Sequence, residues 1–304
     1  MIVPSPYAAQ LESVPVRARS LAVHDRETRY WEYGDSAAAT TIVVVHGFRG
    51  DHHGLEPIVA QLSGYRLICP DLPGFGESEA LSSTHDIHGY AAWLRAFVAE
   101  LHVTGRLVVL GHSFGSIVVA AALADQVPAD DALIPEDVVL INPIAAPALS
   151  GPRGILTRLA VFYYWLASAL PERVGFALLR NRVIVRVMSV TMAKTKDPAL
   201  RRWIHNQHDR YFSAFSDRRV VLEAFTASVS NDVSEFAARI PGHTLLIAAD
   251  KDDITPIAAQ YRLAALFPDA TLQIIHGVGH LVHYEAPAQA AELITDFLGA
   301  EEPA

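Results

Sequence analysis

The hydrophobic positions of this chain fall into short continuous runs, separated by segments with helical spacing. Six apolar runs have the length of strands, and each is apolar on both faces, which is typical of strands buried in a parallel sheet. They cover residues 41–45, 66–69, 107–110, 138–141, 244–247 and 271–275. Two earlier segments, 16–23 and 28–33, alternate in polarity and predict a β-hairpin that turns near residues 24–27.

Helical periodicity separates most of these runs. Apolar spacing predicts helices over residues 55–62, 85–101, 113–123, 257–266 and 286–298, the second with Thr84 as its N-cap. Alternating strands and helices imply right-handed crossovers. The pattern therefore predicts an α/β fold with a doubly wound, mostly parallel sheet.

One connection is far longer than the others. About one hundred residues separate the run ending at Ile141 from the run starting at Thr244, and they show helical periodicity without a strand pattern. This length exceeds one crossover helix, so we expect an inserted helical cap over residues 145–235 and a core domain made of residues 1–144 and 236–304. The aromatic residues of the cap are expected to form core rather than pocket: Phe162, Tyr163, Tyr164, Trp165, Trp203, Tyr211, Phe212 and Phe215.

Composition narrows the class of protein. The chain has 304 residues, 51% of them hydrophobic and 19% charged, so it can bury a large core. Residues 1–20 lack the apolar stretch of a signal peptide, and the apolar run 159–170 is too short to cross a bilayer. A single cysteine, Cys69, excludes an intrachain disulfide and fits a reducing compartment. We expect a cytoplasmic protein without a transmembrane segment, and leave open whether it is a homo-oligomer.

Charge is unevenly distributed along the chain. The net charge of −9 argues against non-specific binding of nucleic acid. Residues 145–235 nevertheless hold thirteen Lys and Arg against seven Asp and Glu, whereas the remainder holds eleven against twenty-six. Two interpretations stay open: an arginine-rich solvent face, or a surface that contacts an anionic substrate or a membrane.

The strongest chemical signal follows the third apolar run. Gly111-His112-Ser113-Phe114-Gly115 lies between a predicted strand and a predicted helix. This G-x-S-x-G arrangement is typical of a nucleophile elbow, a tight turn that lifts a serine hydroxyl clear of the sheet. A serine needs a base within hydrogen-bond reach and a carboxylate to orient that base.

The best candidate for the base is His280. It follows the last apolar run, in a loop that Gly277 and Gly279 free to cross the edge of the sheet. His276 still belongs to the end of the strand, and His283 begins the next segment.

Three aspartates compete for the role of the acid. Asp250, Asp252 and Asp253 all follow the run 244–247. Asn142 follows the run before the cap and cannot carry the charge that stabilises an imidazolium.

Two further loops lie at strand ends and complete the crevice. In residues 45–50, a backbone N–H could face the serine, and residues 70–78 would form a wall.

Together these motifs resemble those of the α/β-hydrolase superfamily, over nearly the whole chain outside the first residues and the cap. The superfamily's acid loop, G-D-x-D-x-x-x-P, aligns with residues 249–256 and implies Asp252 as the acid; Ala249 replaces the usual glycine, which leaves Asp250 as an alternative. Its closing G-x-G-H aligns with residues 277–280. The resemblance further implies that the amides of Phe48 and Phe114 form the oxyanion hole.

The hypothesis is therefore a serine hydrolase that cleaves a carboxylic ester or related acyl compound through an acyl-enzyme. Ser113, Asp252 and His280 would be the catalytic residues, and the partner would be a small apolar substrate chosen by the cap. Alternatives are a C–C bond hydrolase, a thioesterase or a cofactor-free haloperoxidase with the same residues, and a non-enzymatic ligand-binding homologue.

We expect no cofactor and no metal. Asp51, His52 and His53 could be metal ligands, as could His205 with His208, but a solvated loop and a helix face explain them better.

Overall fold

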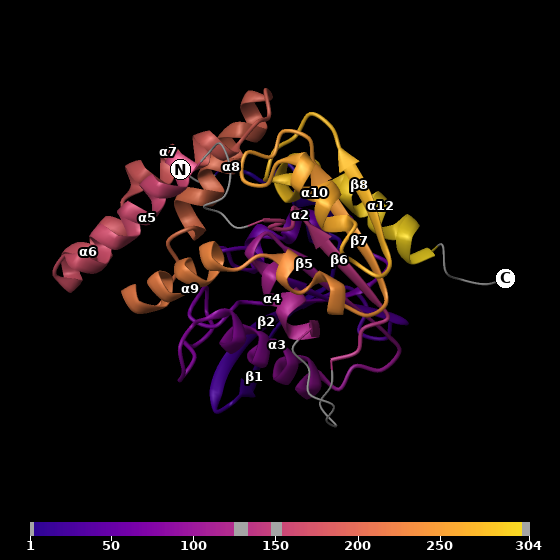
Figure 1. Ribbon diagram of the computed structural model, residues 1–304. Coiled ribbons are helices and arrows are strands. Elements are labelled where there is room, and N and C mark those ends of the chain that lie inside the picture. The colour runs from indigo at the N-terminus through magenta and orange to yellow at the C-terminus, as the bar shows by residue number, and fades with distance from the viewer. Residues whose placement is uncertain (1–2, 125–132, 147–153, 300–304) are drawn as a thin grey trace.

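The computed structural model describes residues 3–124, 133–146 and 154–299 (Figure 1). Within these ranges eight strands form one sheet in the order β1-β2-β4-β3-β5-β6-β7-β8. They are β1 (Val16–Val23), β2 (Arg26–Tyr33), β3 (Thr40–Val45), β4 (Arg66–Pro70), β5 (Arg106–His112), β6 (Asp137–Ile141), β7 (His243–Ala249) and β8 (Ala270–Ile275). Strand β2 pairs antiparallel with β1 and β4, and the remaining neighbours are parallel. The predicted hairpin and the mostly parallel sheet are confirmed.

Helices of the described ranges lie on both faces of the sheet and above it. The α-helices are α1 (Ala8–Glu12), α2 (Glu56–Val59), α3 (Ile87–Leu101), α4 (Phe114–Ala124), α5 (Gly154–Ala169), α6 (Glu172–Leu179), α7 (Arg182–Met192), α8 (Pro198–Tyr211), α9 (Arg218–Ser230), α10 (Ile257–Ala264), α11 (Val282–Glu285) and α12 (Pro287–Gly299). Short 3₁₀ helices are η1 (His52–Gly54), η2 (Val233–Glu235) and η3 (Ala237–Arg239). No helix in these ranges combines the length and the apolarity needed to span a membrane.

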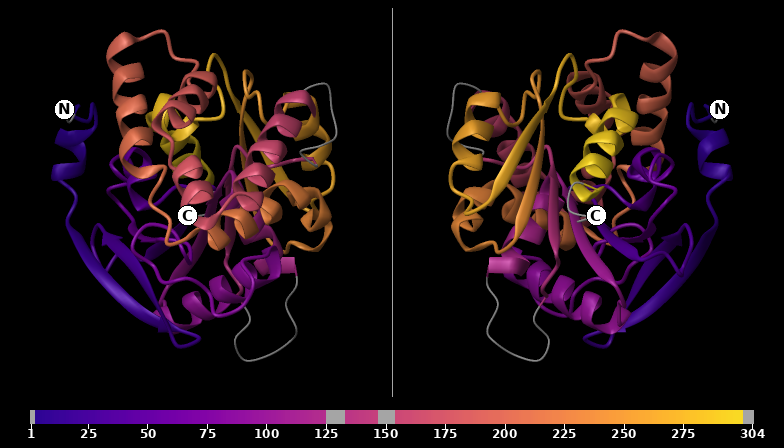
Figure 2. Two further views of the ribbon diagram at one scale, coloured as in Figure 1. Left: turned by 90° about the vertical axis from the view of Figure 1, so that its left-hand side faces the viewer. Right: turned by 90° about the vertical axis from the view of Figure 1, so that its right-hand side faces the viewer.

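Beyond their first residues, strands β3 to β7 are buried on both faces, as their continuous apolar runs predict. The same expectation was wrong for the edge strand β8, where Thr271 and Gln273 are exposed. Alternate residues of β3 point to opposite sides: Val43 and Val45 pack with α3, α4 and α10, whereas Ile42 and Val44 pack with α2 and α12. Figures 1 and 2 show the resulting three layers.

The five helices α5–α9 lie between β6 and β7 in the chain. Figures 1 and 2 place α5–α8 beyond the carboxyl ends of the parallel strands. The segment also touches the core directly, because Phe215 forms an isolated antiparallel bridge with Phe75. The expected start of the cap, residue 145, lies four residues after the end of β6, and residues 147–153 that follow it lie outside the described residues.

Three local predictions were wrong. Helix α2 covers only residues 56–59, because the chain then tightens into i→i−3 hydrogen bonds such as that from the Leu62 N–H to the Val59 carbonyl. The N-cap of α3 is Asp86, not Thr84; the Asp86 side chain accepts a hydrogen bond from the Gly89 N–H. In the segment that was expected to form the cap, Phe162 and Trp165 are exposed rather than core.

The topology identifies the edge where a site can form. Strand β3 lies between β4 and β5, so the chain leaves β3 in one direction and returns on its other side. In open α/β sheets ligands bind beyond the carboxyl ends of the strands at such a reversal. Here those ends are the segments that follow Val45 and His112.

Candidate active site

Ser113 occupies the sharp turn between β5 and α4. Its φ of 54° lies in the left-handed region, which residues other than glycine rarely adopt. Both flanking glycines are needed for space: a Cβ on Gly111 would lie 2.6 Å from the Gly115 carbonyl oxygen, and a Cβ on Gly115 would lie 2.3 Å from the Val45 carbonyl oxygen. The Ser113 N–H donates to the Ile141 carbonyl at 3.1 Å, which ties the turn to the end of β6.

Two residues from later strand ends meet the Ser113 side chain. His280, after β8, places its Nε2 atom 2.8 Å from Ser113 Oγ. Asp252, after β7, places Oδ2 2.8 Å from the Nδ1 atom of His280. His280 and Asp252 are buried, whereas Ser113 is partly exposed. The structure thus joins a hydroxyl, an imidazole and a carboxylate in one line.

The Asp252 carboxylate is held by four hydrogen bonds. Oδ1 accepts from the backbone N–H groups of Ile254 at 2.7 Å and Thr255 at 3.1 Å. Oδ2 accepts from the Asn142 side chain at 3.1 Å in addition to the His280 ring. Burial alone would raise the pKa of Asp252, but the facing His280 and these donors hold the pKa below its usual value. The group is therefore ionised at neutral pH.

Asn142 is a contributor that the sequence analysis missed. An amide cannot supply the negative charge, but Asn142 Nδ2 donates a hydrogen bond to Asp252, which does supply it. The Asn142 φ of 45° and the hydrogen bond from its N–H to the Ile247 carbonyl, 2.8 Å, direct the end of β6 across the edge of the sheet. Its position as a polar residue directly after a buried strand could have identified it as part of the site.

The competing acids lie elsewhere. Asp250 accepts a hydrogen bond from the Gly277 N–H at 2.7 Å and pairs with the exposed His276 ring at 3.3 Å. Asp253 pairs with Lys194 of the segment between α7 and α8. The two ring nitrogens of His280 face Asp252 and Ser113 instead.

The loop after β3 packs against the serine turn. His46 is fixed by its two ring nitrogens: Nδ1 donates to the Gly47 carbonyl at 2.8 Å, and Nε2 accepts from the Leu72 N–H at 2.8 Å. A Cβ on Gly47 would lie 3.2 Å from the Cβ of Ser113. The next amide in the chain, that of Phe48, therefore belongs to a segment that runs beside the Ser113 turn.

Phe48 and Phe114 both contribute rings to an aromatic cluster. Phe114 is the first residue of α4, where backbone N–H groups have no acceptor within the helix. The Phe48 ring lies 6.3 Å from that of Phe114, 6.1 Å from Phe75, 5.9 Å from Tyr164 and 6.0 Å from Phe225, measured between ring centroids. Rings from α5 and α9 thus meet rings of the core above the Ser113 turn.

Arg49 is a buried cation that sequence reasoning did not single out. Only 1% of its surface is exposed, and no carboxylate of the described residues lies within 4.0 Å. Its guanidinium donates to the carbonyls of Phe212 at 3.0 Å and Leu179 at 2.7 Å and to the hydroxyl of Tyr164 at 3.2 Å. Arg49 therefore ties the loop beside Ser113 to α5, to the end of α6 and to the end of α8.

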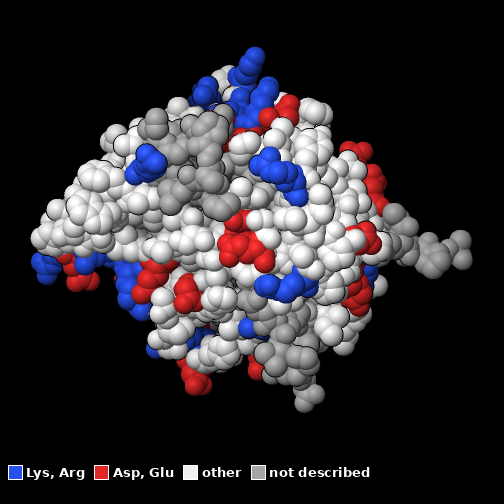
Figure 3. All heavy atoms as spheres, in the orientation of Figure 1, with Lys and Arg blue, Asp and Glu red and all other residues white. Residues whose placement is uncertain are grey.

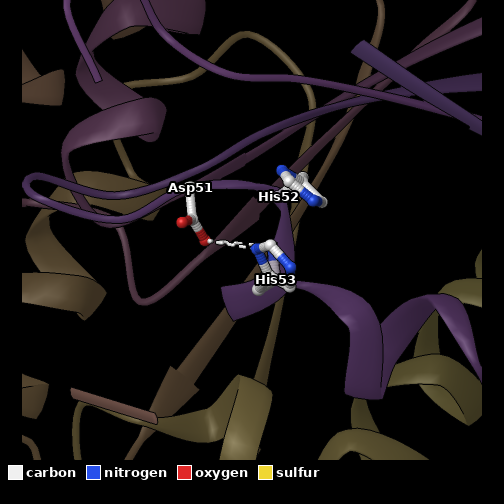
Figure 4. Close-up of side chains that lie close together, drawn as sticks. All are labelled: Asp51, His52 and His53. Carbon is white, nitrogen blue, oxygen red and sulfur yellow. Dashed lines mark hydrogen bonds and ion pairs between the residues drawn. The ribbon is translucent and has the colours of Figure 1, made fainter. Parts of the chain in front are cut away.

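Among the described residues, Asp51, His52 and His53 lie close enough to one another to share a metal ion. Figure 4 shows the Asp51 carboxylate directed at the His53 ring. Asp51 Oδ1 lies 3.4 Å from His53 Nδ1. His52 instead bonds Asp71 through Nδ1 at 2.9 Å and stacks on Trp31. The expectation of a solvated loop was wrong, because Asp51 and His52 are buried in contacts with the protein.

A chain of buried histidines extends from His280 into the helical segment. The rings of His112 and His283 lie 4.1 Å apart between centroids and are tilted by 60°. Ser189 Oγ lies 2.7 Å from His208 Nδ1 and 2.6 Å from His205 Nδ1. The predicted exposed helix face at His205 and His208 was wrong, since both are buried. Burial lowers the pKa of His112 and of His208 to about 3 and that of His283 well below its usual value. These rings are neutral at pH 7.

A doubly wound sheet with a serine on a strained strand-to-helix turn, an acid after β7 and a histidine after β8 has the features that define α/β hydrolases. The chain matches the Alpha/beta hydrolase family over residues 42–293, and it belongs to that family.

Relatives in this family carry different names. The chain is 23% identical to Lipase 1 of Psychrobacter immobilis, covering 94% of this chain and 84% of the lipase. It is 25% identical to a 2-hydroxy-6-oxononadienedioate/2-hydroxy-6-oxononatrienedioate hydrolase of Cupriavidus pinatubonensis, covering 93% and 95%. The esterase of Exiguobacterium antarcticum shares the fold with a TM-score of 0.74 at 16% identity, covering 93% and 100%.

Substitution of Gly115 by alanine should destabilise the protein by about 2 kcal/mol or more, because the new methyl group would meet the Val45 carbonyl. Gly64→Ala is the matched control, since no atom lies within 4 Å of its added Cβ, and it should change stability by less than about 0.5 kcal/mol. Urea unfolding of both variants measures the difference. Equal midpoints would contradict the proposed crowding at the turn.

The buried histidines should make the protein sensitive to mild acid. Their pKa values are lower in the folded than in the unfolded state, so the unfolded state binds more protons below about pH 6.5. Stability is then lost progressively as pH falls from about 6.5 toward 3. We expect His283→Phe to lower the slope of the free energy of unfolding against pH, near pH 5, by roughly 1 kcal/mol per pH unit. His24→Gln, at an exposed position, is the control and should keep the wild-type slope. Parallel slopes in urea unfolding would refute this origin.

Proposed function

We propose that this protein is a serine hydrolase that cleaves a carboxylic ester or a related acyl compound through an acyl-enzyme. The observation that carries the proposal is the pair of 2.8 Å hydrogen bonds from Ser113 to His280 and from His280 to Asp252. The hydroxyl they activate stands on a backbone turn with positive φ. Strain of this kind is typical of a functional site.

In this mechanism Ser113 is the nucleophile and His280 the general base. The ionised Asp252 accepts the Nδ1–H of His280, which leaves the Nε2 lone pair free to take the hydroxyl proton. The serine oxygen attacks the acyl carbon, and His280 then gives its proton to the leaving group. Water repeats the cycle on the acyl-enzyme and regenerates the serine.

Negative charge develops on the acyl oxygen during both steps. The N–H groups of Phe48 and Phe114 are the donors we assign to it. Support comes from the close approach of Gly47 to the Ser113 turn and from the place of Phe114 at the start of α4. A donor of this kind contributes about 3 kcal/mol to transition-state stabilisation.

Residues 145–235 are proposed to act as the cap that selects the substrate. The Tyr164 and Phe225 rings stack at 3.8 Å, and both lie about 6 Å from the Phe48 ring between centroids. An aromatic surface beside the oxyanion donors favours an apolar acyl group over a charged one.

Replacement of Ser113 by alanine should abolish labelling by a fluorophosphonate probe and lower turnover of p-nitrophenyl butyrate by more than about a thousandfold, because the hydroxyl hydrogen-bonded to His280 Nε2 is removed. Ser168→Ala, a serine of α5 on the surface, is the control and should behave as wild type. Equal labelling of Ser113→Ala and wild type would exclude Ser113 as the nucleophile.

The bond that is cleaved requires a separate comparison, since the named relatives include both a lipase and a C–C bond hydrolase. We would assay p-nitrophenyl and glycerol esters alongside vinylogous diketones. Higher kcat/KM for esters supports the proposal. A preference for the diketones would assign the same residues to C–C cleavage.

Asn142→Ala should lower kcat about tenfold without a large change in KM, because Asp252 loses a donor to Oδ2 and orients His280 less firmly. Asn142→Asp instead adds negative charge beside the same pair and favours the protonated imidazole. The acid limb of its kcat/KM profile should therefore move to higher pH. If both variants show the wild-type pH profile and kcat, Asn142 does not position the acid.

A further inference from the structure

A groove of about 1050 Å³ lies between α7 and α8, and none of its lining residues belongs to the site at Ser113. Four arginines line it, two from each helix: Arg182, Arg186, Arg202 and Arg210. A single carboxylate, that of Asp209, accompanies them. The groove is therefore strongly basic.

Most of this positive charge has no counter-charge among the residues that the structure describes. Arg186 pairs with Asp209. Arg210 lies over the Tyr211 ring at 4.8 Å. In the described part of the chain, Arg182 and Arg202 have no carboxylate within 4.0 Å. Their guanidinium groups are thus available to an external anion.

The same side of α7 exposes apolar residues. Val183, Val187 and Val190 follow the spacing i, i+4, i+7 and so share one face of the helix. They are 71%, 60% and 45% exposed. Val183 and Val187 also line the groove beside Arg182 and Arg186. A row of exposed valines flanked by arginines matches a surface that is both apolar and anionic.

The charge of this region contrasts with that of the whole protein. Residues 180–210 contain eight Lys and Arg and two Asp and Glu, in a chain with a net charge of −9. Figure 3 shows basic side chains gathered at the top of the molecule, where Figure 1 places α7 and α8. Such an asymmetric distribution orients a protein toward a negatively charged surface.

We infer that the α7–α8 face docks onto an anionic lipid bilayer, with the arginines at the headgroups and the valine row in the interface. Phosphate or carboxylate headgroups satisfy the unpaired guanidinium groups. The valines bury their exposed surface among the acyl chains, as the apolar face of an interfacial helix does. A nucleic acid or a soluble anion would use the arginines and leave the valines in water.

The test is flotation of the full chain with vesicles of phosphatidylcholine, and with vesicles that contain about one third phosphatidylglycerol. The protein carries Ser113→Ala, so that hydrolysis cannot alter the lipid. Binding to the second vesicles alone is expected, with release when salt rises from about 0.1 M to about 0.5 M.

Variants separate the charged from the apolar contribution. Arg182→Glu with Arg202→Glu should weaken vesicle binding at least about tenfold. Val183→Ser with Val187→Ser should also weaken it, although the charge is intact. Arg26→Glu and Val16→Ser, exposed positions on the distant hairpin, are the controls and should bind as the parent protein. All these side chains are exposed, and circular dichroism checks that each variant is folded.

Three results would overturn the inference: no binding to either vesicle, equal binding to both, or wild-type binding by the arginine variant. If the arginine variant lost vesicle binding and the valine variant bound as the parent protein does, the groove would be a polyanion site instead of a bilayer surface. When the same substitutions are made in protein that keeps Ser113, hydrolysis of a soluble ester is expected to be unaffected. Vesicle binding and the proposed hydrolase activity can therefore fail independently.

Discussion

The turn at Ser113 is the constraint on which the rest of this edge of the molecule depends. It is held between the ends of three strands: β5 carries it, the Val45 carbonyl of β3 closes on Gly115, and the Ile141 carbonyl of β6 accepts the Ser113 N–H. Such close approach leaves no room for a side chain at either glycine. Because the turn cannot relax, the hydroxyl is displayed at a fixed height above the sheet. The groups on the neighbouring loops that face this hydroxyl, His280 among them, must therefore match its position.

A second dependence runs through Arg49. Burying a cation without a carboxylate is costly unless polar groups replace the lost water. Here two carbonyls and one hydroxyl do so, and the Phe212 ring lies 4.7 Å from the guanidinium carbon. Those acceptors all come from the helical segment between β6 and β7, whereas Arg49 adjoins Phe48 on the core. The loop beside Ser113 and the helices above it are therefore ordered together.

The strands were predictable because burial on both faces leaves a continuous apolar run in the sequence. The glycines around Ser113 were recognisable because they belong to a short motif between a strand and a helix, although the carbonyl that crowds Gly115 is that of the distant Val45. Choice among Asp250, Asp252 and Asp253 depended on resemblance, because neighbouring side chains point in different directions and only the fold decides which one reaches His280.

What could not be predicted involves contacts between distant segments. Asn142 and Asp252 are 110 residues apart, and Arg49 and Leu179 are 130 apart. No local pattern reports such pairs. The inserted helices were expected, but their periodicity does not say which face meets the core, and so Phe162 and Trp165 were misplaced.

The helical segment between β6 and β7 presents two chemically different faces. Toward the core it presents aromatic rings and the acceptors of Arg49; on α7 and α8 it presents arginines and valines to the outside. Helices of this kind need only one of their faces for folding. The other face is free to vary without disturbing the turn at Ser113. One arrangement of serine, histidine and aspartate can thus be combined with different outer surfaces, and in this chain the outer surface is basic and apolar, which complements an anionic interface.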